Sequence, residues 1–256
     1  MSENSSDKAG SAKKKVDWRR VALLPLWVAF GFSVAQLVFT TLITVLNNAG
    51  IPFATYNLAV LNAVFAACVY TLTLVIVLGV PFWLRKKSTT RFDLGLWRMP
   101  SWSDIGLAPI GFLLYLIVTA VLAYVAVLLI PGYDQSQVQE TGFANLRDNY
   151  EYILAFATLI VIAPVAEEVL FRGYLYGKLR KSLPAWGAVL IVSLLFGAVH
   201  GQWNVGVDVF ALSLVLCTLR EVTGSIWAGI LLHMIKNSIA FYLLFINPSL
   251  LNIMGG

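Results

Sequence analysis

A few charged and titratable side chains lie inside long apolar stretches of this sequence. They are Glu167, Glu168, Arg172, His200, His233 and Asn237, and more weakly Asp208 and Lys236. A charge at the middle of a bilayer costs about 2.5–3.5 kcal/mol on insertion scales, so each of these residues is a candidate for function. A carboxylate and two imidazoles in a dry cavity suit hydrolysis, because a glutamate can take a proton from water and return it to a leaving amine.

Helical spacing predicts separate roles for the two adjacent glutamates. Glu167 and Glu168 point about 100° apart on a helix, so they cannot share one role. Glu168 and Arg172 are four residues apart with the acid first, which favours an ion pair. We expect this pair to leave Glu167 free to face the site. The alternative is that Glu167 is a solvated residue at the inner end of its helix.

The depth of these residues can be predicted from the helical rise of about 1.5 Å per residue. We measure from residues expected at the inner membrane edge, over the intervals Lys181 to Glu167, Trp186 to His200 and Arg220 to His233. These intervals cover 14, 14 and 13 residues, or roughly 20 Å each. Polar side chains from three helices are therefore expected in one layer.

The two histidines have two possible chemical roles and one structural role. Neutral imidazoles can bind a metal that acidifies water, or they can donate hydrogen bonds to a developing oxyanion. Glu167, His200 and His233 could together hold zinc, and the sequence leaves open whether a metal is required. Asn237 shares a helical face with His233 and could add an oxyanion donor. The structural alternative is hydrogen bonding that joins helices within a bundle.

The remaining polar positions and small residues receive structural interpretations. Asp208 is expected at the membrane interface, and Lys236 is expected to extend its amine outward to water. The pairs Gly173–Gly177 and Gly197–Gly201 have the GxxxG spacing that favours close helix packing.

The composition identifies the environment in which these side chains act. Of 256 residues, 59% are hydrophobic and 12% are charged, against roughly 25% charged in soluble domains. Several apolar runs exceed the roughly 18–20 residues that cross a bilayer. This excludes a cytosolic enzyme, a disordered tail, a disulfide scaffold and a nucleic-acid-binding domain. The net charge of +5 comes from basic residues clustered at the ends of spans, so it reports membrane orientation.

The predicted fold is an all-α, polytopic transmembrane bundle of about seven (6–8) spans. The expected spans are 21–47, 58–84, 104–130, 150–181, 186–201, 206–219 and 225–247. We divide the chain into a basic cytoplasmic tail (1–20), N-terminal transmembrane helices and loops (21–150), a catalytic core (151–247) and a short C-terminal tail (248–256). The fifth and sixth spans are short, so one of them could be tilted or re-entrant.

Charge asymmetry predicts the orientation of the chain. With seven spans and a cytoplasmic N-terminus, 16 of the 18 Lys and Arg residues fall on the inner side, as the positive-inside rule requires. Arg147 lies in an outer loop and Lys236 within the last span. We therefore expect an integral protein, in the plasma membrane, with its N-terminus cytoplasmic and its C-terminus external.

Three short motifs in this region resemble those of a known family. Glu167-Glu168-Val169-Leu170-Phe171-Arg172 is similar to the EExxxR motif of the CPBP family, the CAAX proteases and bacteriocin-processing enzymes also called the Abi family. The segment from Phe196 to His200 resembles its FxxxH motif, and the segment from His233 to Asn237 resembles its HxxxN motif. The three occur in the family's order over residues 167–237.

The resemblance implies an all-helical intramembrane endopeptidase. By analogy, Glu167 would activate water, while His200, His233 and Asn237 would line the site and stabilise the oxyanion. Glu168 and Arg172 would support its geometry. The family is commonly labelled metalloprotease, and a glutamate-dependent mechanism without catalytic metal has also been argued. The expected partners are the bilayer and a membrane-associated or lipidated protein or peptide, with no nucleic acid.

Two alternatives from other functional classes stay open at this point. The first is a non-enzymatic immunity or scaffold protein that keeps the bundle and binds a peptide or a partner. The second is a small proton-coupled transporter that uses Glu167 and the histidines as a relay. The sequence shows no inverted repeat, which weakens the transporter interpretation.

Overall fold

The computed structural model describes residues 16–86, 88–137 and 139–250. Most of the predicted basic tail, Lys87 and the end of the predicted C-terminal tail lie outside these residues. The described part is all-helical and contains no strand. Its main α-helices are α1 (Trp18–Asn48), α2 (Leu58–Leu74), α3 (Val80–Arg85), α4 (Trp102–Leu129), α5 (Asn149–Phe156), α6 (Ala163–Glu167), α7 (Gly177–Leu179), α8 (Ala185–Ala198), α9 (Trp203–Thr223) and α10 (Trp227–Phe241).

Short segments of tighter or wider helix join several of these elements. A 3₁₀ turn, η1 (Phe53–Thr55), precedes α2, and π-helical turns continue other helices without a break. These π turns are η2 (Val75–Gly79), η3 (Ala157–Ile162), η4 (Glu168–Tyr176) and η5 (Tyr242–Ile246). As a result, α2 and α3 form one continuous rod, as do α5 to α7.

The predicted helical segments are all present, and five are long and apolar enough to cross a membrane. Within the described residues these five are Trp18–Asn48, Leu58–Arg85, Trp102–Leu129, Asn149–Leu179 and Trp227–Ile246. The predicted fifth segment is α8, which has only 14 residues and spans about 21 Å, less than a hydrocarbon core of about 30 Å. The predicted sixth segment is α9, which has 21 residues but carries three charged side chains. The all-helical membrane bundle is therefore confirmed.

Local sequence signals explain where several helices begin and end. The Asn57 side chain accepts hydrogen bonds from the amides of Ala59 and Val60 and so caps α2. Ser101 and Asp104 form a capping box at the start of α4, which satisfies amides that have no partner within the helix. Gly224 has a φ of +67° and ends α9, a conformation that favours glycine.

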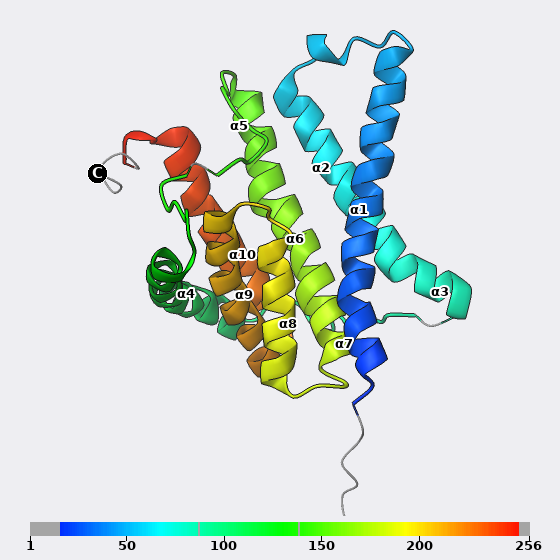
Figure 1. Ribbon diagram of the computed structural model, residues 1–256, viewed down its shortest axis with the longest axis vertical. Coiled ribbons are helices and arrows are strands. Elements are labelled where there is room, and N and C mark those ends of the chain that lie inside the picture. The colour runs from blue at the N-terminus through cyan, green and yellow to red at the C-terminus, as the bar shows by residue number, and fades with distance from the viewer. Residues whose placement is uncertain (1–15, 87, 138, 251–256) are drawn as a thin grey trace, which may run out of the picture.

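The rod from Asn149 to Leu179 occupies the middle of the bundle (Figure 1). The α1–α2 pair packs on one side of it, whereas α8 and α10 pack on the other and contact α9 and α4. The sequence predicts that the strongly apolar part of this rod ends at Pro164 and that the helix continues to Lys181; in the structure the helix extends to Leu179. The π turns η3 and η4 lie on either side of α6. Such turns are frequent at functional sites.

Small residues allow close contact, although not always where the sequence suggested. A Cβ on Gly197 would lie 2.8 Å from the carbonyl oxygen of Gly206, so α8 and α9 are in contact there. Gly173 and Gly177 instead face the backbone of Leu94 and Asp93 in the α3–α4 loop. The prediction that the Gly173–Gly177 pair packs against another helix is thus wrong, because a loop fills that groove.

Candidate active site

Glu167, the last residue of α6, lies between two neighbouring helices. The hydroxyl of Tyr70, on α2, donates a hydrogen bond of 2.5 Å to Glu167 Oε1. The other carboxylate oxygen, Oε2, lies 3.8 Å from His233 Nε2 on α10, and the Glu167 side chain is 14% exposed. One oxygen is thus held in place while the other stays available next to an imidazole.

His233 lies between the two adjacent glutamates. Its Nδ1 is 3.2 Å from Glu168 Oε1, and its Nε2 faces Glu167. Both carboxylates act as acceptors when ionised, and Glu168 is the closer one, so the neutral tautomer with its hydrogen on Nδ1 makes the shorter hydrogen bond. Nε2 then carries the lone pair and can accept a proton.

Glu168 and Arg172 form the ion pair that their spacing predicted. The Arg172 Nη1 donates to Glu168 Oε1 at 2.9 Å, and both side chains are 0% exposed. The guanidinium carbon also lies 4.3 Å from the ring centre of Phe196, within the range of a cation–π contact. Three of the pair's polar atoms, Glu168 Oε2 and Arg172 Nε and Nη2, have no hydrogen-bond partner among the described residues.

Phe196 packs against the titratable residues at this point. Its ring meets those of His200 and His233 edge-on, with centroids 5.0 and 6.0 Å apart. Its carbonyl oxygen lies 2.7 Å from His200 Nδ1. A carbonyl can only accept, so Nδ1 of His200 carries a hydrogen and the neutral ring presents Nε2 as an acceptor. Either histidine can therefore donate to an oxyanion from Nε2 only after it gains a proton.

Asn237 has a backbone partner in this structure. Its amide nitrogen donates to the carbonyl oxygen of Leu159 in η3 at 2.8 Å. That contact joins α10 to a π turn, where the wider helix leaves carbonyl groups available. One N–H of the amide is left for the predicted role as an oxyanion donor.

A cavity of about 370 Å³ opens beside Glu167 and His200. Tyr70 and Thr73 from α2 line it, and Glu140 and Thr141 from the α4–α5 loop also reach it. The remaining walls are mostly apolar and come from α1, η4 and α8, namely Val28, Ala29, Phe32, Gln36, Leu170, Phe171, Leu195, Phe196 and Val199. The site thus offers a carboxylate and an imidazole at the edge of a largely apolar chamber.

The proposed zinc ligands do not come together in this arrangement. Across residues 16–86, 88–137 and 139–250, no three His, Cys, Asp or Glu side chains are grouped closely enough to hold a metal ion. Glu167 and His233 face each other, but His200 does not complete a group of three with them. In this arrangement the described residues therefore do not fit a three-ligand zinc site.

Two polar contacts near the site were not predicted from the sequence. Tyr70 belongs to none of the three motifs, and its only signal was a hydroxyl inside an apolar span. Lys236 was expected to point outward, yet its amine lies 3.2 Å from Asp208 Oδ2. Asp208 also accepts hydrogen bonds from Tyr115 and Thr119 of α4. Lys236 therefore joins α10 to α9 and does not reach outward to water.

The comparisons with known proteins concern the same part of the chain. Residues 149–239 match a family model described as "Type II CAAX prenyl endopeptidase Rce1-like". This segment contains all six residues of the predicted site, so the resemblance to the CPBP and CAAX protease family is confirmed there. The family that this model describes is a protease family, and the match agrees with the apolar helices of an integral membrane protein.

One curated relative and the solved structures complete the comparison. The chain is 34% identical over 89 residues to a protein of Escherichia coli named "Uncharacterized 24.3 kDa protein". The alignment covers 33% of this chain and 41% of that relative's length. No solved structure matches the chain significantly.

Proposed function

We propose that this protein is an intramembrane endopeptidase of the CPBP and CAAX-protease type, with Glu167 as the base that activates water. The observation that carries the proposal is the placement of Glu167. Its free oxygen faces His233, its other oxygen is held by Tyr70, and it lines a chamber of about 370 Å³ together with His200. A carboxylate held in this way can accept a proton from a water molecule in the chamber.

The proposed reaction adds one water molecule across a peptide bond. Glu167 Oε2 takes a proton from the water, and the oxygen of that water bonds to the carbonyl carbon. The carbonyl electrons move onto the oxygen, where a protonated His200 or the amide of Asn237 donates hydrogen bonds. The carbonyl then re-forms, the C–N bond breaks, and Glu167 returns its proton to the leaving nitrogen.

His233 and its partners have a positioning role in this proposal. The imidazole lies 3.2 Å from Glu168 and 3.8 Å from Glu167, so a proton that reaches Nε2 gives a cation between two carboxylates. Opposite charges at this separation attract strongly in a medium of low dielectric constant. Arg172 donates to the Glu168 carboxylate and holds it in place. The histidine can therefore hold a proton close to Glu167 during turnover.

The proposed substrate is a membrane-associated protein or peptide, including a lipidated one. The chamber has apolar walls from α1, η4 and α8 and lies within a bundle of membrane-spanning helices. We also propose that the protein resides in the plasma membrane with its N-terminus cytoplasmic and its C-terminus external. The support for that orientation is the clustering of Lys and Arg at one set of helix ends.

A comparison of new peptide termini tests the proposed function. Membranes from cells with the wild-type protein are compared with those from cells with Glu167→Gln, at matched expression. Asp134→Asn is the control, because Asp134 is an exposed acid in the α4–α5 loop that, within the described part of the chain, accepts only from Ser136. We expect termini that the wild type and the control share and that Glu167→Gln lacks. Identical termini in all three samples would contradict hydrolysis and favour the immunity or scaffold alternative.

A further inference from the structure

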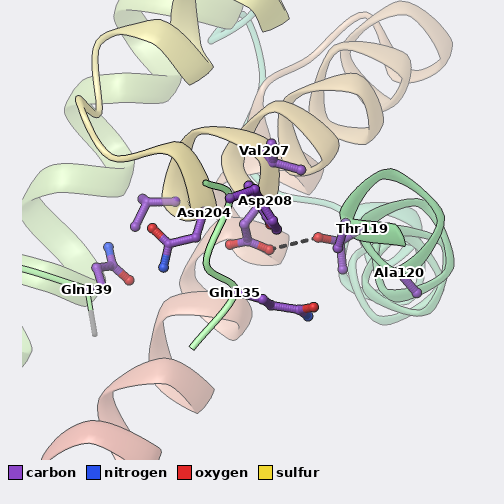
Figure 2. Close-up of a pocket in the computed structure, with 10 residues that line it drawn as sticks. Thr119, Ala120, Gln135, Gln139, Asn204, Val207 and Asp208 are labelled. Carbon is purple, nitrogen blue, oxygen red and sulfur yellow. Dashed lines mark hydrogen bonds between the residues drawn. The ribbon is translucent and has the colours of Figure 1, made fainter. Parts of the chain in front are cut away.

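A second cavity, of about 380 Å³, lies where the α4–α5 loop meets α4 and the start of α9. Six of its ten lining residues are polar, namely Thr119, Tyr133, Gln135, Gln139, Asn204 and Asp208. Figure 2 shows the side chains of Gln135, Asn204 and Asp208 around one space, with Gln139 at its side. Such a concentration of polar groups is unusual for a bundle with mostly apolar surfaces.

Several of these polar groups lack a partner within the described residues. The nitrogen of the Asn204 amide donates to the carbonyl of Gln137 at 2.6 Å, but its oxygen is enclosed and unpaired. No hydrogen bond of the Gln135 or Gln139 side chain is found among the residues that the structure describes. A buried acceptor without a partner is unfavourable, so a ligand with donors would relieve this cost. Asp208 adds a carboxylate, which already pairs with Lys236 at 3.2 Å.

The second cavity adjoins the candidate active site. Gln139 lines the second cavity, whereas the next residue, Glu140, lines the chamber of Glu167. Hydrogen bonds hold this loop segment in place. The Glu140 amide donates to Gln202 Oε1 at 3.1 Å, and the Gly142 carbonyl accepts from the Asn62 side chain. Consecutive Cα atoms are 3.8 Å apart. An extended peptide of a few residues can therefore reach from one cavity to the other.

We propose that this second cavity is a subsite for a basic flank of the peptide substrate, next to the bond that Glu167 would attack. This inference rests on the proposed function. Ammonium and guanidinium groups are donors only, and the cavity offers the free oxygen of Asn204, two glutamine carbonyls and the Asp208 carboxylate. Among the described residues, no Lys or Arg lines either cavity. Glu140 adds negative charge along the same loop, so the favoured ligand carries positive charge.

A protection experiment tests binding without requiring catalysis. In a Glu167→Gln background, Gln139→Cys is compared with Gln137→Cys, whose side chain lines neither cavity. The probes are membrane-inserted leucine-rich peptides in liposomes, with a flank of four lysines, four serines or four glutamates. Alkylation at position 139 is followed by mass spectrometry, separately from Cys68 and Cys217. We expect the lysine flank to slow alkylation at position 139 by about threefold to fivefold, as an ion-pair contact of up to 1 kcal/mol implies.

The outcomes separate this subsite from the proposed function. Equal protection at positions 137 and 139, or protection that ignores the charge of the flank, would overturn the subsite. In the active protein, Gln139→Lys should raise KM for a lysine-flanked substrate by a similar factor and leave kcat unchanged, whereas Gln137→Lys should change neither. If Glu167→Gln loses no cleavage product while protection at position 139 persists, the hydrolytic function fails and peptide binding stands.

Discussion

Replacing Arg172 by methionine gives the sharpest test of how the buried pair supports the site. The substitution removes a guanidinium that is 0% exposed, that donates to Glu168 at 2.9 Å and that lies over the Phe196 ring. Glu168 is then left as a buried carboxylate with His233 as its remaining partner. Removal of one member of a buried pair costs about 3–5 kcal/mol. We expect about 3 kcal/mol here, because an unfolded chain in a membrane still finds polar partners.

The double variant Glu168→Leu/Arg172→Met separates stability from function. Three polar atoms of the wild-type pair have no partner among the described residues, so the pair is incompletely satisfied and apolar replacement loses little. The free energy of unfolding of the double variant should return to within about 1 kcal/mol of the wild-type value. Peptide cleavage by the double variant should still be lost, because the contact between Glu168 and His233 is absent.

Denaturant unfolding in detergent, followed by tryptophan fluorescence, measures these free energies, and the terminus comparison measures cleavage. A value for Arg172→Met within about 1 kcal/mol of the wild type would show that the charge left on Glu168 is not costly. A double variant no more stable than the single one would refute the argument that an apolar pair can replace the charged one. Cleavage by the double variant would refute the positioning role of Glu168.

Three further predictions concern the surroundings of the two glutamates. Tyr70→Phe keeps the ring and removes only the hydrogen bond to Glu167, so the rate of cleavage should fall about tenfold, as loss of about 1.4 kcal/mol implies. Tyr152→Phe is the control, because the Tyr152 hydroxyl donates to a loop carbonyl. An equal fall in the rate for this control would contradict a specific role of Tyr70. Gly229→Ala places a Cβ 2.9 Å from Glu168 Oε2, so the free energy of unfolding should fall by about 1–3 kcal/mol; an unchanged unfolding curve would contradict this. Cleavage by purified protein should survive a zinc chelator, and loss that only added zinc restores would require a metal mechanism.

Much of the fold could be predicted because the bilayer forces each span to be long and apolar. The second span was expected at 58–84 and is present as Leu58–Arg85, with Asn57 as its cap. The pair Glu168–Arg172 followed from i,i+4 spacing, which local geometry fixes. The position and length of each helix in this chain are thus encoded by local sequence, within about 30 residues.

The contacts that the sequence could not predict all join different helices. Tyr70 reaches Glu167 across 97 positions, and Asn57 reaches Glu151 across 94. Lys236 could extend outward or pair inward, and only the place of Asp208 on the facing helix decides the matter. Hydrophobic periodicity reports which face is buried but not which neighbour it meets.

The helices outside the matched segment have a defined part in the site. Residues 149–239 carry all three motifs, but α1 and α2 supply the wall of the chamber opposite His200 and the hydroxyl that holds Glu167. The indole of Trp27 on α1 donates to the Val77 carbonyl in η2, which joins these two helices. Without them, the Glu167 carboxylate would face lipid, where an unpaired charge is costly. The motif segment therefore carries the proposed chemical groups, while α1 and α2 enclose part of the chamber. In the proposed function, these two helices would help to decide which peptides enter it.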